Sequence, residues 1–161
     1  MPTLTLVHVL ISLAGILTGF VVVFGMFAGN PLRGWTAIFL TSTVLTSVTG
    51  FVFFPIEKVT PGIVIGTISL LVLALTIVAR YVKHMEGGWR VTYVITAVLA
   101  FYLNFFVLIV QSFEKVPALK AAAPTQKEPP FLVAQTVALL VFIIFGVVAT
   151  KKFHAHSAHA A

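Results

Sequence analysis

The sequence predicts an all-α integral membrane protein, a single bundle of five transmembrane helices. Of its 161 residues, 60% are hydrophobic and only 9% are charged, and a mean hydropathy of +1.12 excludes an ordinary soluble domain. Five apolar runs each reach the roughly 20 residues that a helix needs to cross a bilayer. They cover about residues 4–28, 35–54, 62–82, 91–112 and 131–150. This predicts one membrane domain, 1–152, followed by a short tail.

The first run, 4–28, combines polar residues with glycines spaced for close helix packing. At helical spacing, one of its faces carries His8, Ser12, Gly15 and Gly19. Glycines four residues apart permit close backbone approach, a principal source of helix association in lipid. Gly25 and Gly29 form a second such pair off this face, where they are free to contact a partner. No basic stretch precedes the run and it exceeds signal-peptide length, so we expect it to be retained.

The second run, 35–54, contains a hydroxyl-rich segment, Thr41–Gly50, in which six of ten residues are Ser or Thr. On a helix these hydroxyls lie on adjoining edges. The opposite side carries Val44, Leu45, Val48 and Val52. The pattern predicts one lipid-facing side and one side of small hydroxyls suited to close packing and interhelical hydrogen bonds. The alternative is that part of the hydroxyl side lines a cavity.

The remaining runs each place polar residues on one face. On the third run this face carries Gly62, Gly66, Ser69, Leu73, Thr76 and Arg80. On the fourth run it carries Tyr93, Ala97, Ala100, Asn104 and Gln111, and on the fifth Gln135, Leu139, Phe142 and Gly146. Because Arg80 lies at the end of its run, we expect its side chain to reach the lipid headgroups.

The longest polar segment, 113–130, contains four prolines and predicts a loop with space for a short surface helix before Pro124. The small, His-containing tail, 153–161, is predicted to be flexible. Its three histidines lack a carboxylate or a rigid scaffold, so they form at most a weak site for a transition metal.

The net charge of +6 lies in short loops and near the C-terminus, where it sets topology and meets anionic headgroups rather than nucleic acid. With the N-terminus outside, the inner side receives Arg33, Arg80, Lys83, Arg90, Lys151 and Lys152. The outer side then receives Lys58, Lys115, Lys120 and Lys127. Because basic residues favour the cytoplasmic side, this distribution predicts N-out and C-in.

Six polar residues form the candidate ligand site: His8, Ser12, Thr46, Asn104, Gln111 and Gln135. At a rise of about 1.5 Å per residue, they gather in the outer halves of their helices, whereas the inner halves look plainer. Such residues are costly within a membrane unless they are paired or hydrated. In one interpretation they bond to each other and lock the bundle. In the other they line a small wet pocket, with His8 and Asn104 at its floor and Gln111 and Gln135 at its mouth.

Most catalytic chemistry finds no support in the sequence. The chain has no cysteine, no acid within a run and no phosphate-binding or nucleophile motif, which argues against an enzyme and weakens a proton-coupled pump. Two histidines cannot hold one haem, because His8 lies near one surface and the others lie near the opposite one. No cofactor is predicted, and a haem on a single histidine is the alternative.

Three parts of the chain resemble a known group of proteins. The first is Leu6–His8. The second is Arg33–Ala37 followed by Thr46–Phe51, and the third is Ala123–Pro130. In them the chain is similar, over nearly its whole length, to short bacterial hypothetical membrane proteins. The resemblance implies a bacterial inner-membrane setting. It implies no activity, cofactor, partner or functional residue.

The sequence therefore favours a small, non-enzymatic membrane protein that holds a polar or amphipathic molecule in an outer-leaflet pocket. A quinone headgroup or a lipid-like metabolite fits this description, and the lipid bilayer is the other expected partner. Two alternatives are open. In the first, the protein is a structural or accessory subunit whose polar stripes only pack helices and which binds a second copy or a membrane partner. In the second, it is an oligomeric transporter or channel for a neutral or anionic solute.

Overall fold

A computed structural model describes residues 2–53 and 57–154. Its elements are α1 (Pro2–Phe27), α2 (Arg33–Phe53), α3 (Pro61–Ile77), the π-helical turn η1 (Val78–Val82), α4 (Trp89–Lys115), α5 (Pro117–Ala122) and α6 (Pro129–Lys152). The described residues contain no strand, and five helical segments are long and apolar enough to cross a membrane. The predicted all-α membrane bundle is confirmed, and the helix ends agree with prediction to within a few residues.

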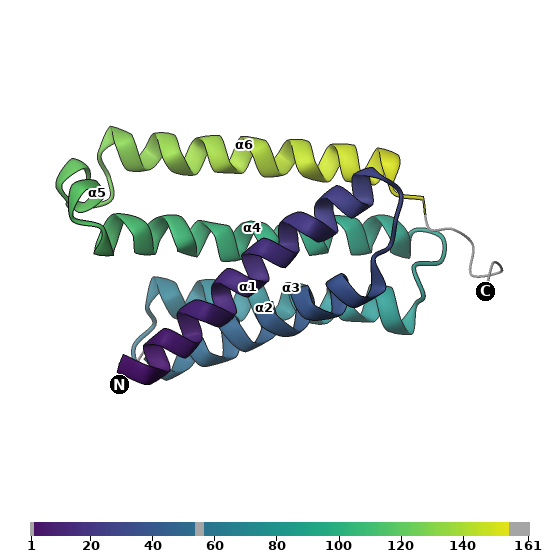
Figure 1. The fold of residues 1–161 in the computed structure, drawn as a ribbon, viewed down its shortest axis with the longest axis horizontal. Helices are drawn as coiled ribbons and strands as arrows, with labels where there is room; N and C mark the ends of the chain where they lie inside the picture. Colours follow the sequence, from purple (N-terminus) through teal and green to yellow (C-terminus); the bar gives the residue numbers. More distant parts are fainter. Residues whose placement is uncertain (1, 54–56, 155–161) are drawn as a thin grey trace.

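Figure 1 shows how the five long helices are arranged. Helices α4 and α6 run antiparallel and side by side, with α5 in the connection between them, and α3 packs against both α2 and α4. Helix α1 crosses the bundle diagonally. It packs along α2, and its C-terminal end reaches α6, where Phe24 and Phe27 contact Phe145. Because of this tilt, α1 touches α4 only over part of its length.

The helices begin where local chemistry favours a start. The Thr60 hydroxyl accepts a hydrogen bond from the Ile63 N–H, and Pro61 occupies the first helical position, where no backbone bond is lost. Prolines likewise open α5 and α6. The presence of α5 confirms the short helix expected before Pro124. Gly29, with φ of +70°, lets the chain leave α1 and turn toward α2.

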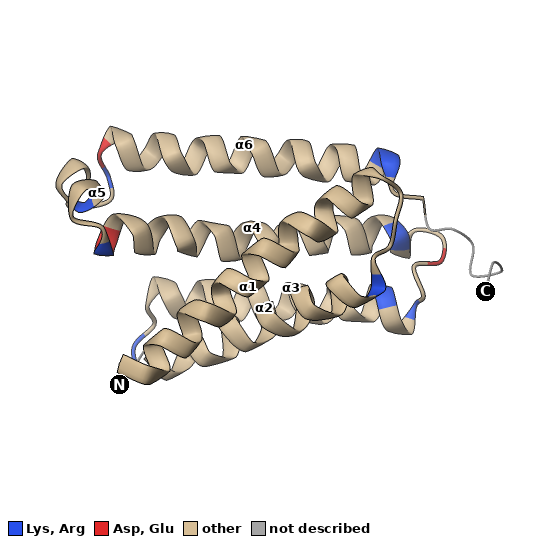
Figure 2. Cartoon of the chain, in the orientation of Figure 1, with Lys and Arg blue, Asp and Glu red and all other residues tan. Residues whose placement is uncertain are grey.

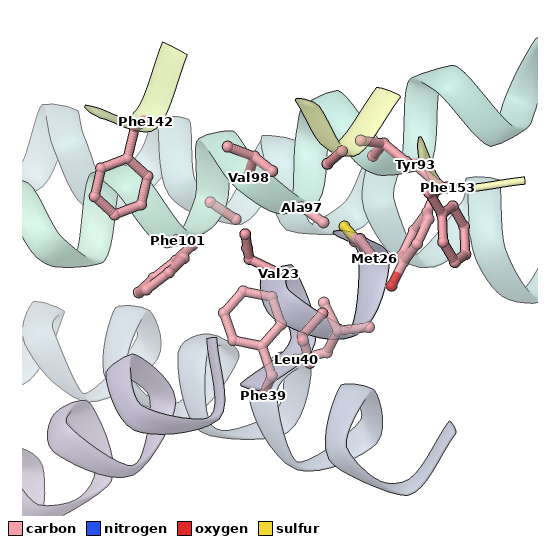
Figure 3. Close-up of a cluster of buried hydrophobic side chains, with 14 of the residues drawn as sticks. Val23, Met26, Phe39, Leu40, Tyr93, Ala97, Val98, Phe101, Phe142 and Phe153 are labelled. Carbon is pink, nitrogen blue, oxygen red and sulfur yellow. The ribbon is translucent and has the colours of Figure 1, made fainter. Parts of the chain in front are cut away.

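The core is built around Phe101 of α4, whose side chain is fully buried (Figure 3). Its ring contacts those of Phe20, Phe39 and Phe142, with centroids 4.9, 6.1 and 4.8 Å away. Gly19 makes room for this ring, because a Cβ there would lie 2.7 Å from a ring carbon of Phe101. The close helix approach predicted from the glycines of the first run is therefore confirmed.

The lipid-facing side predicted for α2 is confirmed by Leu45, Val48 and Val52, which are exposed, while Val44 is partly buried. Charged residues gather at the two ends of the bundle (Figure 2). We call one of them the cationic end, and it carries Arg33, Arg80, Lys83, Arg90, Lys151 and Lys152. We call the other the N-terminal end, and it also carries the α4–α6 connection.

Candidate polar site in the bundle

The first polar contact joins α1 to α2 near the N-terminal end. Nδ1 of His8 lies 2.7 Å from Oγ1 of Thr49, and the imidazole packs edge-on against Phe53, with 5.2 Å between ring centroids. The Thr49 hydroxyl donates its single proton to the Leu45 carbonyl at 2.7 Å, so its oxygen is left to accept. His8 therefore donates through Nδ1–H. The lone pair on Nε2 is then the remaining acceptor of the ring.

The other hydroxyls of the candidate site bond within their own helices. Ser12 and Thr46 each donate to the carbonyl four residues earlier, at 2.8 and 2.9 Å. Thr43 and Ser47 on α2 do the same. This side of α2 was expected to form several interhelical hydrogen bonds. Among the described contacts it forms one, between Thr49 and His8. The reason is that a carbonyl of the same helix is always within reach of a Ser or Thr hydroxyl.

Asn104 lies deeper, where α4 meets α1 and α2. Its side chain is buried and packs on Gly15, since a Cβ added to that glycine would lie 3.1 Å from Nδ2 of Asn104. Oγ1 of Thr43 borders the same point, 3.3 Å from that Cβ position. Within the described part of the chain, Nδ2 has no hydrogen-bond partner. A buried polar group left in this state costs about 1–3 kcal/mol, so an added partner would stabilise the site.

The two glutamines lie nearer the N-terminal end, on α4 and α6. Nε2 of Gln135 donates to the Phe106 carbonyl at 3.4 Å, whereas its buried Oε1 has no partner among the described residues. Gln111 is partly buried. It follows Val110, whose carbonyl accepts a hydrogen bond from the Gln126 side chain at 3.0 Å. The side-chain amides of Gln135 and Gln126 thus link α6 and the α4–α6 connection to α4. The Oε1 atom of Gln135 is the acceptor left without a partner among the described residues.

The six candidate residues lie in three groups. His8, Ser12 and Thr46 belong to the α1–α2 pair, Asn104 to the contact of α4 with α1, and Gln111 and Gln135 to the α4–α6 pair. Beyond the contact of Gly15 with Asn104, α1 and α4 diverge toward the N-terminal end (Figure 1), where the charge of Lys115 acts on His8. Two surface grooves, one between α2 and α3 and one between α4 and α6, are lined by none of the six.

Arg80 forms a second polar centre, at the cationic end. Its side chain is only 6% exposed; Nη2 donates to the Pro31 carbonyl at 3.1 Å, and the guanidinium stacks 5.1 Å from the ring centroid of Tyr93. The expectation that Arg80 reaches the headgroups is therefore wrong, because the side chain points inward and fastens the α1–α2 turn. A signal for this exists in the sequence. The signal is that Arg80 shares one helix face with Leu73 and Thr76. The structure buries both of these residues fully.

The half of the bundle near the cationic end contains more buried polar residues than expected. Thr36, Thr76 and Tyr93 are fully buried there, and Tyr93 lies beside Thr36 and Arg80. Thr36 donates to the Pro31 carbonyl at 3.1 Å and Thr76 to the carbonyl four residues earlier at 2.8 Å. Buried polar groups therefore extend through both halves of the bundle. The expectation that the inner half carries few polar side chains is wrong.

Arg90 and Phe153 close the cationic end. The Arg90 guanidinium donates to the carbonyls of Thr150 and Phe153, which caps the C-terminus of α6. The Phe153 ring is fully buried, 6.0 Å from that of Tyr93 (Figure 3). Residue 153, the first of the predicted flexible tail, is thus part of the packed bundle. Residues 155–161 lie outside the described residues.

The second glycine pair is packed inside the molecule. A Cβ at Gly25 would collide with the Leu32 side chain, and Gly29 lies in the turn after α1. The two glycines therefore shape the α1–α2 turn. The expectation that this pair forms a docking face for a partner is wrong, because a helix that ends at Phe27 does not present both residues on one surface.

The chemistry available at these positions is hydrogen bonding. Within residues 2–53 and 57–154, no three His, Asp or Glu side chains lie close enough together to hold a metal ion. Amides, hydroxyls and an imidazole can bind and orient a small molecule. Comparisons of the chain with protein-family models, with curated proteins and with solved structures give no match.

Proposed function

We propose that this integral membrane protein binds a small polar or amphipathic molecule, of the quinone or lipid-like kind, and catalyses no reaction on it. The molecule lies where α1 and α4 diverge toward the N-terminal end. Its polar head is held by His8, Ser12, Thr46, Asn104, Gln111 and Gln135. Asn104 and His8 form the floor of this site, and aromatic side chains supply its apolar walls.

Two buried amide atoms without partners give the main support for this proposal. They are Nδ2 of Asn104, a donor, and Oε1 of Gln135, an acceptor. In the apolar interior of a membrane protein bulk water does not supply the missing partner, so such atoms usually meet a ligand or a bound water. A donor and an acceptor together favour a molecule that has both a carbonyl and a hydroxyl group.

The surrounding charge favours an electron-rich head. The amide of Asn104 donates, and Lys115 places a positive charge near His8 from the end of α4. Both features favour a carbonyl or phenolate oxygen as the group bound. Nε2 of His8 is an acceptor for a hydroxyl of the same molecule. A quinone or quinol head offers these groups on one ring.

The proposal includes a setting, the bacterial inner (cytoplasmic) membrane with the N-terminus outside and the C-terminus in the cytoplasm. The resemblance to short bacterial membrane proteins supports the membrane. The six basic residues of the cationic end, against four at the N-terminal end, support the orientation. In this orientation the proposed site lies in the outer leaflet.

Binding of a benzoquinone with a ten-carbon tail tests the proposal. The purified protein is titrated with this probe, and solvent extracts of the same preparation are examined by mass spectrometry for a co-purified ligand. Asn104→Leu should lower the affinity about tenfold, equivalent to roughly 1.4 kcal/mol for the lost hydrogen bond. The double variant His8→Leu/Asn104→Leu should abolish co-purification without unfolding the bundle.

Thr67→Val is the matched control, because Thr67 is exposed on α3 and, among the described residues, its hydroxyl bonds only to the carbonyl of Ile63, at 2.8 Å. It should bind the probe like the unaltered protein. A double variant that is more stable and still carries the ligand would mean that these polar groups only pack helices. A Soret band in the purified sample would instead point to a haem on His8.

A further inference from the structure

A narrow groove runs between α4 and α6 on the surface of the bundle. It has a volume of about 500 Å³, and its walls include Val98 and Tyr102 of α4 and Phe142 of α6. Along α6 it extends from Leu139 to Lys151, a distance of about 18 Å at 1.5 Å per residue. One leaflet of a bilayer has an apolar depth of about 15 Å. The groove therefore matches a single leaflet, the one at the cationic end.

The shape of the groove suits a hydrocarbon chain. A volume of about 500 Å³ spread over about 18 Å leaves a channel only a few ångströms wide. A helix with its side chains is about 10 Å across and does not fit such a channel. Gly146 keeps the channel open, because its missing side chain would otherwise project toward Val98, the nearest side chain at 3.9 Å from an added Cβ.

The end of the groove at the membrane surface is positively charged. Lys151 belongs to its wall, and Lys152 follows in the last turn of α6. The C-terminus of a helix normally disfavours an anion, because its free carbonyls carry partial negative charge. Here Arg90 donates to the carbonyls of Thr150 and Phe153 and so offsets that charge. The two lysines are then left to bind an anion.

Few acids compete for these lysines. Glu86 is the single carboxylate at the cationic end among the described residues, and it lies in the α3–α4 connection. The other glutamates lie at the N-terminal end: Glu57 in the α2–α3 connection, Glu114 in the last turn of α4 and Glu128 just before α6. A phosphate near Lys151 and Lys152 would therefore meet mainly positive charge.

We propose that the α4–α6 groove binds one anionic phospholipid from the leaflet at the cationic end. One acyl chain fills the groove as far as Tyr102 and Leu139, and the phosphate binds Lys151 and Lys152. This site is separate from the polar ligand site, which lies at the other end of the bundle and in the other leaflet.

Lipid retention measured by native mass spectrometry tests the proposal. The full chain is reconstituted with equal amounts of phosphatidylglycerol and phosphatidylcholine of identical acyl chains, then released from detergent in the spectrometer. The unaltered protein should retain phosphatidylglycerol preferentially. Lys151→Gln/Lys152→Gln should reduce that preference by about fivefold for each lysine, the factor expected for one basic residue near an anionic headgroup.

Gly146→Leu tests the acyl chain independently of the headgroup. The new side chain has space at its Cβ and favours a helix, so the variant should fold, but its outer atoms occupy the groove. Retention of both lipids should fall. Gly34→Leu is the control for this change, since no atom of the described residues lies within 4 Å of a Cβ added at that exposed position. Lys120→Gln/Lys127→Gln is the control for charge at the opposite end.

Three results would overturn the proposal. The first is equal retention of the two lipids by the unaltered protein. The second is a Gly146→Leu variant that keeps phosphatidylglycerol as well as Gly34→Leu does. The third is a change from dimer to monomer in Gly146→Leu with lipid retention unaltered, which would mean that the groove contacts a second copy of the chain.

Discussion

The imidazole Nδ1 of His8 lies 2.7 Å from the Thr49 hydroxyl oxygen and joins the N-terminal part of α1 to the end of α2. Because the Thr49 oxygen accepts this bond, Thr49→Val leaves the His8 N–H without a partner. A double-mutant cycle with His8→Leu should give a coupling energy of about 0.6 kcal/mol, the average for hydrogen bonds between membrane helices, and no more than about 1.7 kcal/mol. Unfolding in mixed detergent micelles measures it. A coupling of zero would mean that the contact does not stabilise the helix pair.

Gly19 is the point at which α1 can least tolerate a larger residue. Gly19→Ala places a methyl group 2.7 Å from a ring carbon of Phe101, so this ring, which is fully buried among other aromatic rings, or helix α1 must shift. We expect a loss of about 1–3 kcal/mol in the free energy of unfolding, typical of overpacking. Gly34→Ala, in open space, should leave stability equal or slightly higher. Thermal unfolding of the two purified variants compares them directly.

Arg80 should stabilise the cationic end through its hydrogen bond and its stacking, more than through its charge. Arg80→Ala removes the donor to the Pro31 carbonyl and the packing on Tyr93, so we expect a loss of about 2–4 kcal/mol. Arg80→Lys keeps the charge but lacks the planar group that makes both contacts, so it should be nearly as unstable. Chemical denaturation provides the comparison. A fully stable lysine variant would show that charge alone is sufficient.

The extent of each helix was predictable because it depends on local properties. An apolar run between charged or proline-rich segments defines a membrane span, as at Pro61, where Thr60 caps the helix and the proline begins it. Periodicity also predicted correctly that Leu45 and Val48 face lipid and that Gly19 permits close packing. These inferences need only neighbouring residues.

The remaining features depend on contacts between distant parts of the chain. Periodicity defines the inward face of α1 but not its diagonal path. It therefore does not show that His8 of α1 contacts α2 while Gln135 of α6 contacts α4. The inward position of Arg80 depends on the Pro31 carbonyl, which is 49 residues away in sequence. Likewise, Ser and Thr hydroxyls can bond to their own helix or to a neighbour, and composition does not distinguish the two.

Glu128 makes the turn before α6 sensitive to acid. Its carboxylate accepts hydrogen bonds from the Thr125 hydroxyl at 2.7 Å and from the Lys127 N–H at 3.0 Å. These bonds, that from Thr125 foremost, hold the pKa of Glu128 below its ordinary value of 4.5. The folded turn therefore binds the proton less readily than the unfolded chain. Its stabilisation is complete above pH 4.5 and is lost as the pH falls through the lowered pKa.

Thr125→Ala should raise the pKa of Glu128 toward its ordinary value and weaken this dependence on pH. Nuclear magnetic resonance of carboxyl-labelled glutamate follows the titration, and amide exchange of the turn follows its opening. An unaltered Glu128 pKa in Thr125→Ala would show that the threonine hydroxyl does not stabilise the carboxylate.

The orientation of the bundle can be tested cleanly because the chain has no cysteine. A single cysteine at Lys120 in α5 should react with a membrane-impermeant maleimide in cells whose inner membrane is intact and whose outer membrane admits the reagent. A cysteine at Glu86, in the α3–α4 connection, should react only after the inner membrane is opened. Because acidic residues contribute little to the positive-inside bias, Glu86→Cys should leave the orientation of the bundle unchanged. If Glu86→Cys were labelled in intact cells and Lys120→Cys were not, the orientation would be the opposite one, and the proposed ligand site would lie in the inner leaflet.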